Sequence, residues 1–77
     1  MTINHLQFSP NGQLLATASR DRTVKIWDAA SLELFKVIDT LRFGGHLRSV
    51  NRLRWVSDLE LVSVSDDRTA AVWKIEL

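Results

Sequence analysis

The feature that most constrains the fold of this chain is an internal repeat. The segment "TASRDRTVKIWDA", residues 17–29, returns 46 residues later as "SVSDDRTAAVWKI", residues 63–75. The two copies share five residue types at matching positions, which are Ser19 and Ser65, Asp21 and Asp67, Arg22 and Arg68, Thr23 and Thr69, and Trp27 and Trp73. A period of this length indicates repeated structural units that each bury a face against a neighbouring unit.

The composition describes a small globular chain without covalent or metal cross-links. At 77 residues it is one domain at most, and a single core of that size contributes only about 3–5 kcal/mol of net stability. Because the chain has no cysteine and only two histidines, disulfides and thiolate zinc sites are excluded and most other metal sites lack ligands. The sequence therefore predicts no metal and no cofactor.

The charge pattern limits the partners that the chain is expected to bind. The net charge is +1 and the basic residues are interleaved with acidic ones, so no nucleic-acid partner is expected. No apolar run approaches the roughly 20 residues of a membrane helix. The opening stretch "MTINHLQFSP" lacks the basic and apolar blocks of a signal peptide. These observations predict a cytoplasmic protein without a membrane partner.

The local pattern within each repeat is that of short β-strands. Runs of about six residues, rich in branched and aromatic side chains, are bounded by turn formers. They predict strands at residues 3–8, 13–19 and 23–28 in the first unit, and at 50–55, 61–65 and 69–75 in the second. Residues 33–41, "ELFKVIDTL", are interpreted as a fourth strand of the first unit, although their apolar spacing also fits a helix. The expected fold class is all-β with antiparallel sheets.

The first predicted strand of each unit carries its apolar residues at an irregular spacing. In both units the spacing is three and then two residues, at Ile3, Leu6 and Phe8 and again at Val50, Leu53 and Trp55. A regular strand cannot present all three on one face, because side chains alternate between faces. The pattern predicts a β-bulge after the first residue of each set.

The second predicted strand is apolar or small on both faces, and the second unit stops early. Residues 14–16 and Ala18 show no alternation with polar side chains, which indicates a strand covered on both sides. One four-stranded sheet cannot supply both covers for itself. The second unit ends after its third strand, which leaves an edge of unpaired backbone groups.

These segments resemble the WD-repeat β-propellers, whose blades are four-stranded antiparallel sheets of about 40–45 residues. The resemblance rests on "FSPNGQLLATASRDRTVKIWD", which ends in Trp27-Asp28, and on Gly45-His46 before the second copy. It implies one blade at residues 1–43 and another at 44–77 that lacks its outer strand. The chain is thus expected to be a C-terminal part of an incomplete propeller, with further blades or further copies of itself closing the ring.

The second unit departs from the family pattern in two places. Trp73-Lys74 stands where the family has Trp-Asp, and "WVSDLE" replaces the usual Phe-Ser-Pro-Asp-Gly turn.

His46, Ser63 and Asp67 are the residue types of a hydrolase triad. The resemblance implies instead that they form a structural hydrogen-bonded tetrad with Trp73, and that Thr17, Asp21 and Trp27 are its incomplete counterpart. Catalysis would need a nucleophile on a strained turn and a site for an oxyanion. Ser63 lies within a predicted strand without a neighbouring glycine, so the chain is not expected to be an enzyme.

The resemblance implies a protein-interaction scaffold that binds proteins or peptides. The family uses the face formed by the turns between second and third strands and by the starts of the inner strands. Carried over, the candidate contact residues are Asn4, Arg20, Asn51 and Asp66, each of which could equally be an ordinary solvated residue. The alternative is a fragment of a propeller-based enzyme, or of a propeller fused to a catalytic domain. His5 is interpreted as a residue on the surface of its strand and not as a metal ligand.

Overall fold

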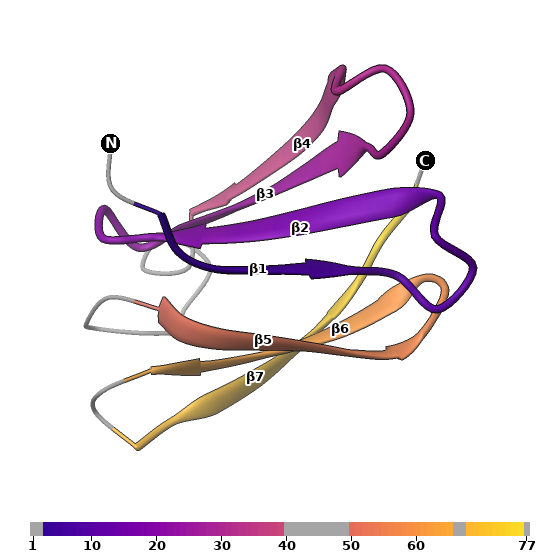
Figure 1. The fold of residues 1–77 in the computed structure, drawn as a ribbon. Helices are drawn as coiled ribbons and strands as arrows, with labels where there is room; N and C mark the ends of the chain where they lie inside the picture. The colour runs from indigo at the N-terminus through magenta and orange to yellow at the C-terminus, as the bar shows by residue number, and fades with distance from the viewer. Residues whose placement is uncertain (1–2, 40–49, 66–67, 77) are drawn as a thin grey trace.

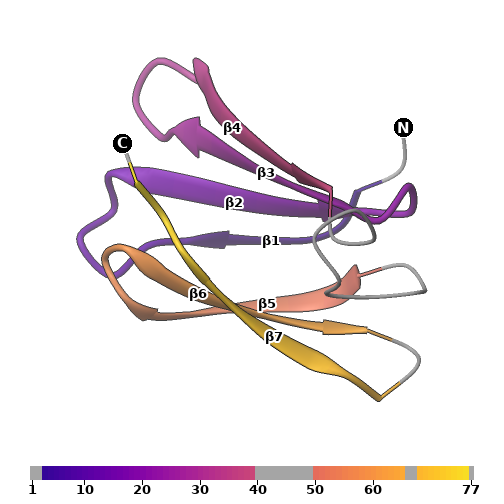
Figure 2. The ribbon, with the colours of Figure 1, turned by 180° about the vertical axis from the view of Figure 1, so that it is seen from behind.

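The computed structural model describes residues 3–39, 50–65 and 68–76, which form two antiparallel sheets (Figures 1 and 2). The first sheet contains, in spatial order, β1 (Ile3–Phe8), β2 (Leu14–Ser19), β3 (Thr23–Asp28) and β4 (Leu34–Asp39). The second contains β5 (Val50–Ser57), β6 (Glu60–Ser65) and β7 (Ala70–Lys74). The all-β prediction is confirmed, and each predicted strand agrees with an observed one to within two residues at either end.

The segment with ambiguous periodicity is a strand. β4 pairs antiparallel with β3 from Thr23↔Asp39 to Trp27↔Leu34, so its backbone groups are satisfied by the sheet. In the described part of the chain, no helix is long and apolar enough to cross a membrane.

Both predicted β-bulges are present. The pairing of β1 with β2 shifts between Ile3 and His5, and that of β5 with β6 shifts between Val50 and Arg52. Each bulge brings the three apolar side chains of its strand onto one face, as the spacing required. Further register shifts, between Ile26 and the next residue of β3 and near the end of β5, were not predicted.

The turns that join the strands show why particular residues recur. Gly12 closes the β1–β2 turn with a φ of +72°, a left-handed conformation that costs glycine little. The turn between the second and third strands ends at Arg22 in one unit and Arg68 in the other, with φ values of +68° and +65°. Non-glycine residues adopt this conformation at a cost, so its recurrence shows that Arg22 and Arg68 are held in the same backbone conformation.

The core lies between the two sheets. Its members from the first sheet are Leu14, Ala16, Ala18, Val24, Ile26 and Ile38, and those from the rest of the chain are Val50, Leu53, Trp55, Leu61 and Ile75. β5 lies against β1 and β2, so the two sheets stack face to face as neighbouring blades would (Figure 1). The interior is made mostly of small and β-branched side chains from strands that are distant in sequence.

Equivalent positions of the two units differ sharply in burial. Val50, Leu53 and Trp55 are 0%, 3% and 7% exposed, because their face meets the first sheet. Their counterparts Ile3, Leu6 and Phe8 are 48%, 50% and 52% exposed. Each sheet therefore has one covered face and one open face.

Candidate functional site

Each unit contains a hydrogen bond from a tryptophan to a hydroxyl on the neighbouring strand. Trp27 Nε1 donates to Thr17 Oγ1 at 3.0 Å, and Trp73 Nε1 donates to Ser63 Oγ at 2.8 Å. The side chain of Ser63 is fully buried and that of Thr17 is nearly so. The Ser63 hydroxyl is therefore buried and already engaged in a hydrogen bond within its own sheet. His46 and Asp67, the other predicted members of the tetrad, lie outside the described residues.

Asp21 belongs to a separate network in the β2–β3 turn. Its Oδ1 accepts hydrogen bonds from the Ser19 hydroxyl, from Thr23 Oγ1 at 2.6 Å and from the Thr23 backbone N–H at 3.1 Å. These bonds, with that from Ser19 the largest contribution, lower the pKa of Asp21 to about 2. Asp21 thus bonds to Ser19 and Thr23, the residues on either side of its turn. The hydrogen bond between Trp27 and Thr17 does not include Asp21.

The residues that hold Asp21 were not identified as site residues from the sequence. Ser19 and Thr23 both recur in the repeat, as Ser65 and Thr69. Their recurrence on either side of the repeated aspartate was the available signal, because a carboxylate at a turn needs donors of this kind within two residues.

The depressed pKa of Asp21 predicts an acid-dependent loss of stability. Because the folded pKa lies below the ordinary value, the stabilisation is present at pH 5 and disappears as the pH falls towards 2. Asp21 is solvent-exposed, so we expect Asp21→Asn to cost on the order of 1 kcal/mol at pH 5. Urea unfolding at pH 5, 3.5 and 2 should show wild type and variant converging, whereas Glu33→Gln should follow wild type throughout. A constant difference between wild type and Asp21→Asn would contradict this assignment.

Three of the four predicted contact residues lie at one end of the strands. Asn4 is near the start of β1, Arg20 is in the β2–β3 turn and Asn51 is near the start of β5. Arg20 is exposed and Asn51 is half-buried. Asn4 Nδ2 donates to the Val50 carbonyl oxygen at 3.1 Å, so part of its amide links the two sheets. Asp66 lies outside the described residues.

His5, interpreted from the sequence as a surface residue of its strand and not as a metal ligand, contributes to the contact between the sheets. Its side chain is half-buried, and Nδ1 accepts a hydrogen bond from the Leu53 backbone N–H at 2.9 Å. Two residues further on, the Gln7 carbonyl oxygen accepts a bond from Trp55 Nε1 at 2.9 Å. Together with Asn4, these residues form a polar seam between β1 and β5. In the described residues, no three histidine, cysteine or acidic side chains come together as a metal site.

This arrangement of repeated strands, turns and tryptophan bonds agrees with a comparison to known families. Residues 1–28 and 35–74 match the family model described as "WD domain, G-beta repeat". The chain belongs to the WD-repeat family. Its two sheets are β-propeller blades of this family in an open arrangement, with four and three strands.

Named relatives share the family with this chain. Nucleoporin SEH1 of Bos taurus is 36% identical over 75 residues, which cover 94% of this chain and 20% of that protein. A Gallus gallus subunit of chromatin assembly factor 1 is 33% identical over 92 residues, with 95% of this chain and 16% of that protein covered. Telomerase protein component 1 of Rattus norvegicus is 35% identical over 69 residues, with 90% and 3% covered.

A solved structure has the same arrangement of strands. The crystal structure of the computationally designed Ika4 protein superposes with a TM-score of 0.76 and 31% sequence identity, covering 96% of this chain and 41% of that one. This WD-repeat chain therefore spans less than half of that structure and a fifth or less of the relatives named above.

Proposed function

We propose that this chain is a non-catalytic protein-interaction module. The proposal rests on the burial and bonding of Ser63. Of His46, Ser63 and Asp67, which together have the residue types of a hydrolase triad, Ser63 would be the nucleophile. Its side chain is fully buried and its hydroxyl accepts the Trp73 indole N–H. A buried hydroxyl in the middle of a strand supports a structural role, because a catalytic serine must reach its substrate. Two of the WD-repeat relatives are, by name, a nucleoporin and a component of an assembly factor, which supports a role in protein complexes.

The proposed contact surface is the end of the strands that carries Arg20. Arg20 is exposed in the β2–β3 turn, and arginine is enriched among the residues that dominate binding energy. The proposed partners are proteins or peptides in the cytoplasm. The net charge of +1 supports this over a nucleic-acid or membrane partner, since it provides no strong electrostatic attraction to either.

The experiment that tests this surface is photo-cross-linking from position 22, which is exposed in the same turn as Arg20, so that Arg20 itself is kept. We expect a benzoylphenylalanine at position 22 to capture a specific cellular protein. Arg20→Glu should then weaken binding of the purified partner by about tenfold while leaving unfolding unchanged within about 0.5 kcal/mol. Lys36→Glu in the middle of β4 makes the same charge change away from this end and serves as the control. Equal binding by wild type and Arg20→Glu would exclude the surface.

We further propose that the open sheet faces are covered by neighbouring blades, from the same protein or from another copy of this chain. On the covered face of the first sheet Ala18 pairs with Val24, and on the open face of the second sheet Val64 pairs with Ala70. The same two side chains occur in exchanged order, so the pairs have equal volume and leave a similar surface for a neighbour. Val64 is 40% exposed in this structure, which is consistent with a face that lacks its cover.

A further inference from the structure

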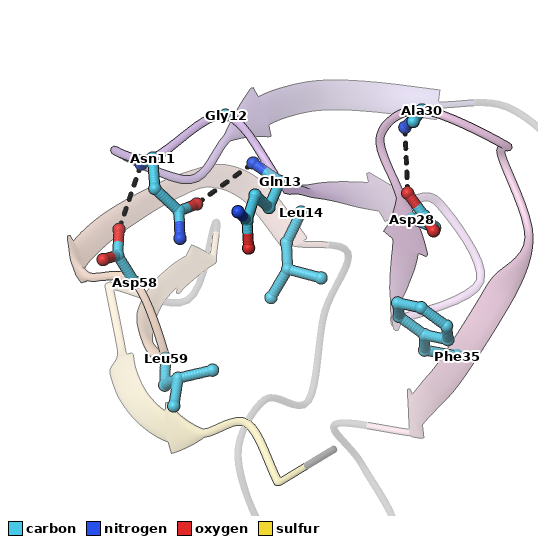
Figure 3. Close-up of a pocket in the computed structure, with 9 residues that line it drawn as sticks. All are labelled: Asn11, Gly12, Gln13, Leu14, Asp28, Ala30, Phe35, Asp58 and Leu59. Carbon is cyan, nitrogen blue, oxygen red and sulfur yellow. Dashed lines mark hydrogen bonds between the residues drawn. The ribbon is translucent and has the colours of Figure 1, made fainter.

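A pocket lies between the two sheets, at the end of the strands away from Arg20 (Figure 3). It is bounded by the β1–β2, β3–β4 and β5–β6 turns and has a volume of about 400 Å³. We propose that this pocket binds an arginine side chain of a partner peptide together with an adjacent apolar residue. The site is separate from the end that carries Arg20, so the proposal does not depend on the function proposed above.

Two aspartates line the pocket on opposite sides (Figure 3). Asp28, the last residue of β3, and Asp58, in the β5–β6 turn, lie on opposite sides of the hollow (Figure 3). Asp28 Oδ1 accepts the Ala30 backbone N–H at 2.9 Å, and Asp58 Oδ1 accepts the Asn11 backbone N–H at 3.0 Å. These bonds fix the orientation of each carboxylate, while the second oxygen of each can accept a bond from a ligand.

The negative charge of Asp28 and Asp58 favours a cationic ligand in the pocket. Among the described residues that line it, none is a lysine or an arginine, so the two negative charges have no partner there. Concave walls of one charge sign concentrate the field and attract an oppositely charged group. A bare divalent cation fits poorly, because Ca²⁺ takes six to eight oxygen ligands and Mg²⁺ requires near-ideal octahedral geometry.

The walls of the pocket favour a cation with an apolar stem. Leu14, 5% exposed, forms part of its lining, and Phe35 and Leu59 are 46% and 49% exposed. Phe35 lies on the same side of the hollow as Asp28 (Figure 3). A guanidinium bound to Asp28 can therefore stack on the Phe35 ring, and its methylene groups can cover the leucines. A planar guanidinium also matches a carboxylate with two parallel hydrogen bonds, which an ammonium cannot do.

Two short peptides provide the test. The isotope-labelled chain is titrated with the capped peptides Gly-Leu-Arg-Leu-Gly and Gly-Leu-Gln-Leu-Gly, and amide chemical shifts are followed by NMR. We expect the arginine peptide to bind at least about fivefold more tightly and to shift the amides of Gln13, Ala30 and Leu59. Equal binding of the two peptides, or shifts confined to the end that carries Arg20, would overturn the proposal.

Charge-neutralising variants test the two carboxylates directly. Asp28→Asn and Asp58→Asn keep a carbonyl oxygen for the turn hydrogen bond, so we expect each to weaken the arginine peptide about three- to fivefold. Binding of the glutamine peptide should not change. Glu33→Gln lies in the same β3–β4 turn as Ala30 but does not line the pocket, and it should keep wild-type affinity within about twofold. If a variant fails to fold, the peptide comparison on the wild-type chain still decides the question.

Discussion

Leu53→Ala is expected to lower the free energy of unfolding by about 2–4 kcal/mol, whereas Leu6→Ala should lower it by less than about 1 kcal/mol. The two leucines occupy the same position of the two repeats, so this is a matched pair. Leu53 is 3% exposed between the sheets, and its removal leaves a cavity there. Leu6 is 50% exposed on the open face of the first sheet, where solvent or a neighbouring surface fills the space.

Urea unfolding followed by tryptophan fluorescence measures both values. Since a core of this size supplies about 3–5 kcal/mol, we expect Leu53→Ala to be largely unfolded at 37 °C. Self-association is measured separately by sedimentation velocity. Leu6→Ala should weaken any association of copies through the open face of the first sheet. Equal destabilisation by the two variants would show that both faces of the first sheet are covered in solution.

The strands and bulges could be predicted because they depend on local spacing. Alternation, turn residues and the three-then-two spacing of Ile3, Leu6 and Phe8 are all visible within a few positions. The repeat strengthened each prediction, since the same spacing appears twice. The proposed division of the chain at residues 43 and 44 stays a prediction, because residues 40–49 lie outside the described part.

The polar seam between β1 and β5 could not be predicted from the same signals. His5 bonds to the backbone of Leu53, and Gln7 offers its carbonyl oxygen to Trp55, across 48 residues of sequence in each case. A repeat identifies residues that are equivalent, but equivalent residues need not be neighbours. Which residues meet depends on how one sheet stacks on the other, and this stacking also buries Leu53 while leaving its counterpart Leu6 exposed.

The pocket lined by Asp28 and Asp58 also results from the stacking of the two sheets. Asn11 and Asp58 come from two different turns and Asp28 from the end of β3. These three residues surround one hollow because the two sheets stack (Figure 3). Asp58 is the counterpart of Asn11 in the first unit, and the family turn also has an aspartate in this place. The residue by itself therefore did not identify the pocket in the sequence.

The bond between Trp73 and Ser63 carries the second large prediction. Ser63→Ala removes a fully buried acceptor and leaves the indole N–H without its partner, so we expect a loss of about 1–3 kcal/mol in the free energy of unfolding. Ser31→Ala makes the same chemical change on an exposed turn and should cost no more than about 0.5 kcal/mol.

Hydrogen exchange of the indole N–H groups identifies which bond is lost. In Ser63→Ala the Trp73 indole should exchange faster while the Trp27 indole, bonded to Thr17, keeps its wild-type rate. Thr17→Ala should give the opposite result. Faster exchange of both indoles in either variant would mean that the two units unfold together, and unchanged exchange in both would refute the structural role of these hydroxyls. A selective effect means that each sheet is stabilised by its own tryptophan, which explains why a chain of this length contains the motif twice.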